Sequence, residues 1–182
     1  MYTNFESIAK KKKFNKTKGF GQDLKSDAYQ MTVGFTCLNC GFQVLSAVTF
    51  SGVMNRNHCS FCLWSRHLDH WQAGDRLSAC KMPMQPIALT FKKSRKKYGT
   101  VRGELMIIHQ CQACTAISIN RIAADDRCDV LLDTMKKESK IRPDQKQLLD
   151  KSGIEPICEK DYKRVAMSLL GPVEKVVQIA YW

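Results

Sequence analysis

Cysteines arranged in pairs are the side chains of this sequence best suited to chemistry. Three pairs have two intervening residues each, and they stand at Cys37/Cys40, Cys59/Cys62 and Cys111/Cys114. Two intervening residues allow a tight turn that directs both sulfurs at one ion about 2.3 Å away, and two such turns complete a tetrahedral shell. Thiolate ligands favour Zn²⁺ over harder cations. The pattern therefore predicts one or two bound Zn²⁺ ions as cofactors.

The first two pairs are predicted to form one site. The segment Cys37-Leu38-Asn39-Cys40-Gly41 is typical of a zinc knuckle, because a glycine lets the backbone turn back toward the sulfurs. Eighteen residues separate Cys40 from Cys59, an interval close to those of zinc ribbons and treble clefs. We therefore expect Cys37, Cys40, Cys59 and Cys62 to bind one ion.

The third pair, Cys111/Cys114, needs two further ligands. The candidates are Cys80 and the histidines His58, His67 and His109. Cys80 with His67 is the preferred combination and would complete a second site. The alternative is that the third pair closes the first site in place of one of the other pairs. The isolated Cys128 and Cys158 are predicted to be small buried hydrophobic residues.

Arg56, Asn57 and His58 directly precede a predicted ligand. We expect them to hydrogen-bond the thiolates or neighbouring backbone carbonyls. The alternative is a hydrolase in which His58 acts as a base with Asp69 or Asp75. Hydrolytic zinc needs an open coordination position for water, and a shell of four thiolates offers none. The sequence therefore favours a binding module over an enzyme.

The composition indicates a small protein without a membrane span. The chain has 182 residues, of which 44% are hydrophobic and 25% are charged. It contains no run of eighteen or more apolar residues, and the first residues lack the pattern of a secretion signal. We therefore expect a cytoplasmic location, where the reducing conditions favour metal ligands over disulfides.

The elements predict a small α+β fold stapled by metal. Residues 1–34 are expected to form a flexible basic arm, 35–128 the zinc module, and 129–182 a helical extension. Short antiparallel strands are predicted at 43–45, 47–50, 105–108 and 117–119, the last two forming a hairpin around the third cysteine pair. Helices are predicted at 130–135, capped by Asp125 or Asp126, from Pro143 to a stop at Gly153, and at 162–169. The module resembles a zinc ribbon or treble clef.

The formal net charge of +12 is concentrated in two segments. Phosphate contacts are predicted for the basic residues of the arm and of the segment 92–97, which are Lys10, Lys11, Lys12, Lys13, Lys16, Lys18, Lys92, Lys93, Arg95, Lys96 and Lys97. Such an asymmetry favours a polyanionic partner. We therefore predict binding to RNA or to a ribonucleoprotein surface such as that of a ribosome.

Two features bear on that partner. Trp71 and Tyr98 could be exposed and stack on unpaired bases, whereas Phe61 and Trp64 are expected to pack against the zinc knuckles. The alternative function is a protein–protein adaptor that docks through the helical extension. The sequence indicates no small-molecule substrate.

The cysteines and their neighbours match a known family pattern. The matching residues are Gly34-Phe35-Thr36-Cys37, Cys40-Gly41, Arg56-Asn57-His58-Cys59, Cys62-Leu63, Ser65, His67, Asp69, Gly74-Asp75-Arg76, Cys80, His109, Cys111, Cys114, Asn120-Arg121, Ala123 and Asp125-Asp126. In this order they resemble the bacterial RNHCP domain family over about residues 34–133. The departures are Ser60, Ala73 and Thr115, and none of these positions is a predicted ligand. The resemblance implies a module of the zinc-ribbon type and no particular activity.

Overall fold

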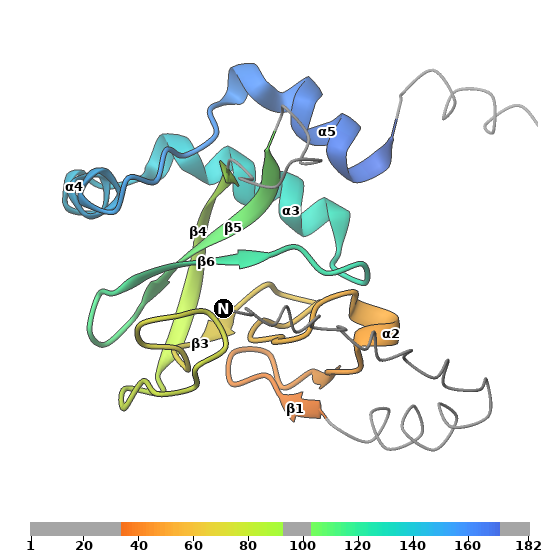
Figure 1. Ribbon diagram of the computed structural model, residues 1–182. Coiled ribbons are helices and arrows are strands. Elements are labelled where there is room, and N and C mark those ends of the chain that lie inside the picture. Colours follow the sequence, from red (N-terminus) through yellow and green to blue (C-terminus); the bar gives the residue numbers. More distant parts are fainter. Residues whose placement is uncertain (1–33, 93–102, 172–182) are drawn as a thin grey trace, which may run out of the picture.

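The computed structural model describes residues 34–92 and 103–171, and it confirms a small α+β fold (Figure 1). The chain begins with a two-stranded antiparallel sheet, β1 (Gly34–Thr36) and β2 (Gln43–Leu45), which pairs Phe35 with Val44. The strand predicted at 47–50 was wrong, because α2 (Val48–Ser51) occupies that segment. Ser51 Oγ donates a hydrogen bond to the Ala47 carbonyl, and Gly52 ends the helix at φ 68°. These local contacts outweigh the β preference of a run that has no partner strand among the described residues.

A four-stranded antiparallel sheet forms the centre of the molecule. Its order is β3 (Ser65–Arg66), β4 (Pro83–Lys92), β5 (Glu104–Cys111) and β6 (Ile117–Arg121). The predicted hairpin around the third cysteine pair is therefore confirmed, with longer strands than expected. Register shifts between Pro86 and Ala88, where a proline lacks the N–H that a ladder requires.

Three α-helices and two short 3₁₀ helices follow the sheet: α3 (Cys128–Met135), η1 (Lys136–Lys140), α4 (Pro143–Lys151), η2 (Glu159–Asp161) and α5 (Tyr162–Leu170). The predicted start at Pro143 and the stop at Gly153, which adopts φ 63°, are confirmed. The predicted cap of α3 was wrong, because the helix begins one residue after Arg127, which occupies the N-cap position. The carboxylates of Asp125 and Asp126 are engaged by Arg56 instead.

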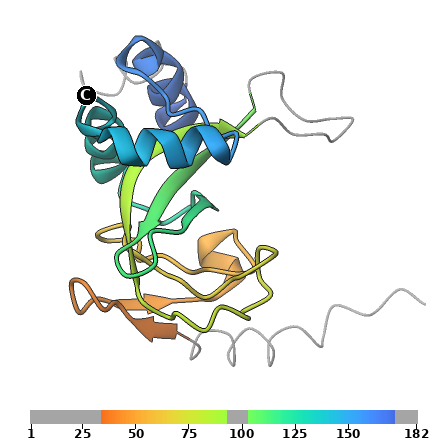
Figure 2. The ribbon, with the colours of Figure 1, turned by 90° about the vertical axis from the view of Figure 1, so that its left-hand side faces the viewer.

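The helical extension shares its hydrophobic core with the sheet. The main core cluster combines Leu63, Leu89 and Ile107 with Leu131, Met135, Ile157 and Val165. A backbone hydrogen bond of 2.8 Å runs from the Ile157 amide to the Leu89 carbonyl. Figures 1 and 2 show α3, α4 and α5 together at one end of the long strands, with β1, β2 and α2 at the other end. Within residues 34–92 and 103–171, no helix is both long and apolar enough to cross a membrane.

Candidate metal centres and the buried network beside them

Two groups of four side chains in the described part of the chain could each hold a metal ion. The first group consists of Cys37, Cys40, Cys59 and Cys62, whose sulfurs all lie within 4.8 Å of one another. The sulfurs of Cys37 and Cys62 are 3.6 Å apart, and those of Cys40 and Cys59 are 3.7 Å apart. Four sulfurs about 2.3 Å from a shared tetrahedral ion would stand about 3.8 Å from one another. The group is therefore already spaced for one ion.

The turns that carry the three cysteine pairs have the same backbone conformation. The amides of Cys37, Cys59 and Cys111 donate to the carbonyl five residues later, each over 2.9 Å. The residue four positions after each of these cysteines adopts a positive φ, and these residues are Gly41, Leu63 and Thr115. Glycine adopts that conformation without strain, whereas leucine and threonine adopt it at a cost. Thr115, one of the departures from the family pattern, is therefore a strained residue within the same turn.

The first group is buried at Cys37 and Cys59 and exposed at Cys40, and burial affects the pKa of its thiols. Burial raises the pKa of the Cys59 thiol to about 11, although backbone amides of Cys62 and Phe61 hydrogen-bond its sulfur. Burial also raises the pKa of Cys62. A bound cation offsets this cost, because metal binding displaces the thiol protons. The amides then serve as donors to the thiolates.

The second group consists of His67, Cys80, Cys111 and Cys114. Cys80 and Cys111 sulfurs are 3.6 Å apart, and His67 Nδ1 lies 3.3 Å from the Cys114 sulfur. Partial burial, together with the charge of His70, lowers the pKa of His67. A lower pKa favours the neutral imidazole that a metal ion requires.

The two groups follow the division of ligands preferred from the sequence. The third pair joins Cys80 and His67 and does not close the first group. Cys62 and His67 belong to different groups, yet only four residues separate them, and these include the whole of β3. Cys128 and Cys158 lie outside both groups and are partly exposed, so the prediction that they are buried was wrong.

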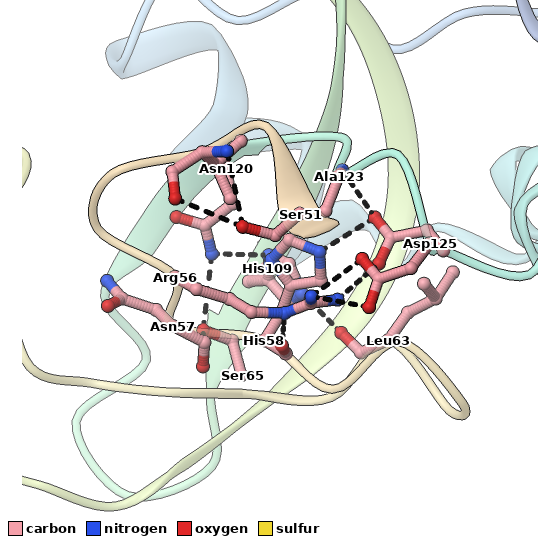
Figure 3. Close-up of polar contacts among 12 residues, drawn as sticks. Ser51, Arg56, Asn57, His58, Leu63, Ser65, His109, Asn120, Ala123 and Asp125 are labelled. Carbon is pink, nitrogen blue, oxygen red and sulfur yellow. Dashed lines mark hydrogen bonds and ion pairs between the residues drawn. The ribbon is translucent and has the colours of Figure 1, made fainter. Parts of the chain in front are cut away.

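His58 lies in a buried ionic network and outside both metal groups (Figure 3). Its Nε2 donates to the Asp126 carboxylate over 2.8 Å. Arg56 donates to Asp125 over 2.6 and 2.7 Å, to Asp126 over 3.0 Å, and to the His58 carbonyl over 3.0 Å. The Arg56 and Asp126 side chains are fully buried. The network therefore fastens the residues that precede Cys59 to the turn that precedes α3.

His109 makes a second buried cluster, which Figure 3 shows beside the first. Its Nε2 donates to the Leu63 carbonyl over 2.7 Å, and its Nδ1 accepts from the Asn120 amide over 3.1 Å. The same Asn120 amide group donates to Ser65 Oγ over 3.2 Å. Burial lowers the pKa of His109 to about 3, so the ring is neutral at pH 7. The cluster therefore joins β3, β5 and β6 to Leu63 in the turn that carries Cys59 and Cys62.

Asn57 and two aspartates order the loop between β3 and β4. The Asn57 amide donates to Asp69 over 2.9 Å and accepts from Arg76. Asp75 accepts hydrogen bonds from the amides of His70, Trp71, Gln72 and Leu77, and these bonds hold its pKa well below the ordinary range. The loop that carries His67 and Cys80 is therefore held by its own carboxylates.

Several residues of these networks were not assigned a role from the sequence. Asp126 was expected to cap a helix, and Asn120 had no assigned partner. Both belong to the matched pattern, but a pattern does not identify the buried histidine that each one contacts, because the contacts span 68 and 11 positions. Trp64 packs against the first group, as predicted. Phe61 is instead about half exposed and stacks on Phe42, with the Arg127 guanidinium over its ring.

Most of the predicted phosphate contacts lie outside the described residues. These are Lys10, Lys11, Lys12, Lys13, Lys16, Lys18, Lys93, Arg95, Lys96 and Lys97. Lys92 is described, and it is exposed at the end of β4. Trp71 is 82% exposed at its loop, as the sequence suggested.

Comparison with known proteins agrees with the geometry. No curated protein and no solved structure matches the chain. The model of the RNHCP domain matches residues 32–132, a span that contains both cysteine groups, the Arg56–His58 network and the start of α3. Since this match covers more than half of the sequence, the chain belongs to the RNHCP domain family.

Proposed function

We propose that the protein binds two structural Zn²⁺ ions and that the resulting scaffold binds RNA. The observation that supports the zinc is the pair of preformed groups, one of four cysteines and one of three cysteines and a histidine. Such ligand sets are those of structural zinc sites. Each ion would have four protein ligands, which leaves no position for a catalytic water. Both ions are therefore proposed to stabilise the fold and to have no catalytic role.

The zinc is tested by native mass spectrometry of the full chain, purified without added chelator. The expected result is two zinc ions per molecule and two reactive thiols, Cys128 and Cys158, rising to nine thiols after chelation. One ion, or none in a folded protein, would refute the proposal. Chelation should also lower the midpoint of thermal unfolding, because the binding free energy of a structural ion contributes to folding.

The distribution of charge supports RNA as the partner. The described residues contain 16 Lys and Arg against 13 Asp and Glu, whereas the remaining residues contain 13 against four. Two zinc ions with seven thiolates and a neutral histidine would carry about three negative charges in total. The described body would then be close to neutral. Almost all of the excess positive charge therefore lies in the arm and in residues 93–102. These are the segments proposed to contact the phosphates of RNA.

RNA binding is tested by fluorescence anisotropy with single-stranded RNA over a range of salt. Replacing Lys10, Lys11, Lys12 and Lys13 by Gln should weaken binding. The slope of log K against log salt concentration should become shallower by about 0.7 per lost phosphate contact. The matched control replaces Lys136, Lys137, Lys140 and Lys151, which lie in the helical extension. Equal loss in the control would locate the binding elsewhere. Negligible affinity of the zinc-loaded chain for RNA at low salt would refute the proposed partner.

A further inference from the structure

A cleft of about 170 Å³ lies between parts of the chain that carry ligands of the two metal groups. Its lining includes Cys37 and its neighbours in the first knuckle, both residues of β3, and part of the loop from β3 to β4. His67 and Cys80 of the second group lie in that loop. An apolar cavity of about 150 Å³ holds a benzene ring, so the cleft can accept a planar ring of that kind.

The lining combines aromatic rings with amides. Phe35 of β1 and Trp64 of the second knuckle both line the cleft, and both are partly exposed. Asn39 also lines it and donates its amide group to the Cys62 sulfur over 3.6 Å, which leaves the amide oxygen to accept from a ligand. Aromatic side chains stack on unpaired bases, and amides hydrogen-bond the edges of those bases. The lining is therefore of the kind that recognises a nucleobase.

The charge of the cleft is positive. Among the described residues, no Asp or Glu lines it, whereas Arg66 and Arg76 both do. Arg66 is exposed, and its Nε donates to the Lys81 carbonyl over 2.9 Å, with no carboxylate partner in the described part of the chain. Arg76 has a side chain 39% exposed and lies 3.9 Å from Asp69. A guanidinium is well suited to a phosphate.

We infer that this cleft binds one unpaired nucleotide of an RNA strand, with the base against Phe35 and Trp64 and a phosphate at Arg66 and Arg76. The inference rests on the proposed RNA binding and adds a site to it. The arm and residues 93–102 supply general attraction to phosphates, whereas the cleft supplies contact with a base. An acidic peptide would use the arginines and leave the rings and the Asn39 oxygen without a role.

Two substitutions with matched controls test the site in the full, zinc-loaded chain. Arg66→Gln removes the phosphate contact, and Arg121→Gln removes an exposed arginine of β6 outside the cleft. Phe35→Leu removes a ring, and Phe50→Leu does the same at an exposed position outside the cleft. Anisotropy with a single-stranded RNA decamer should show about five-fold weaker binding for each cleft variant. Both controls should stay within twofold of the natural chain.

A spectroscopic readout separates contact with the cleft from general attraction. Addition of uridine 5′-monophosphate should shift the indole N–H resonance of Trp64 in an NMR spectrum and leave that of Trp71 in place. Inorganic phosphate alone should shift neither. Arg66→Gln should weaken this response. It should also reduce the slope of log K for RNA binding against log salt concentration by about 0.7.

The outcomes distinguish the site from the partner. RNA binding that both cleft variants retain, with zinc content unchanged, refutes the site and leaves the proposed function in place. Absence of RNA binding by the natural chain refutes the partner. A mononucleotide that binds as tightly as the decamer identifies a free nucleotide as the occupant and overturns the assignment to RNA. A cleft variant that loses zinc is replaced by Arg66→Lys, which keeps the positive charge and loses the planar guanidinium, so that a smaller weakening than that of Arg66→Gln is expected.

Discussion

The imidazole of His58 donates a hydrogen bond of 2.8 Å to the carboxylate of Asp126, a residue 68 positions later in the chain. Both side chains are buried, and Asp126 also accepts from Arg56 and from the Ala123 amide. The residue before a cysteine of the first group is thereby fixed to the turn that precedes α3. This contact accounts for the position of His58 by a structural role, without a role in hydrolysis.

Asp126→Asn should destabilise the protein by about 3–5 kcal/mol, because it leaves the buried Arg56 guanidinium without one of its carboxylates. Urea unfolding of the zinc-loaded chain would measure this loss. Asp129→Asn is the control, since Asp129 is exposed and its ion pair within the described residues is with Arg127 at the surface. Similar losses of unfolding free energy in both variants would show that the buried network stabilises the fold no more than a surface ion pair does.

His67→Ala should reduce the zinc content from two ions to one, because it removes the only nitrogen ligand of the second group. His70→Ala is the matched control, an exposed histidine three positions later that lies outside both groups. Native mass spectrometry after dialysis against a mild chelator would count the ions. Two ions retained by His67→Ala would mean that another residue completes the second site.

Thr115→Gly should stabilise the protein by about 1 kcal/mol, because Thr115 adopts φ 60° and glycine does so without strain. The same change at Thr49, which is exposed within α2, should destabilise by about 0.5–1 kcal/mol. Thermal unfolding of the two variants would reveal the opposite signs. A loss of stability at both positions would show that the threonine side chain makes an essential contact.

Most of the elements follow from local sequence, and the exceptions have physical causes. Pro143 and Gly153 bound α4 as expected, because their backbone preferences act without distant partners. Residues 47–50 have the composition of a strand, yet no strand in the described part of the chain pairs with them, and the short helix α2 forms instead. Asp126 is a good capping residue in isolation, but a buried arginine and histidine compete for its carboxylate.

The cysteine groups were largely predictable because spacing restricts how pairs can meet around an ion. The choice of histidine was narrowed to three candidates by the sequence, and the fold separates them. His67 follows β3 and faces Cys114, whereas His58 and His109 are each engaged by buried polar partners. The cleft was not predictable, because its lining brings Phe35 and Arg76 together from segments that share no local pattern.

Leu149→Ala should destabilise the protein by about 2–5 kcal/mol, although Leu149 lies in α4, beyond the matched family region. It is fully buried against Ile87, Ala88 and Ile108 of the sheet. Leu170→Ala, at a half-exposed position of α5, should change stability by no more than about 0.5 kcal/mol. A negligible effect of Leu149→Ala would mean that the extension folds apart from the module.

The four residues between Cys62 and His67 have a consequence for how this chain can vary in length. They include β3, whose pairing with Met84 and Pro83 fixes their backbone, and the ligands at their two ends belong to different metal groups. An inserted or deleted residue there would displace one ligand from its group and shift every side chain of β3 to the opposite face. We therefore expect related chains to keep this spacing constant and to differ in length between β4 and β5, where the sequence contains no Cys or His.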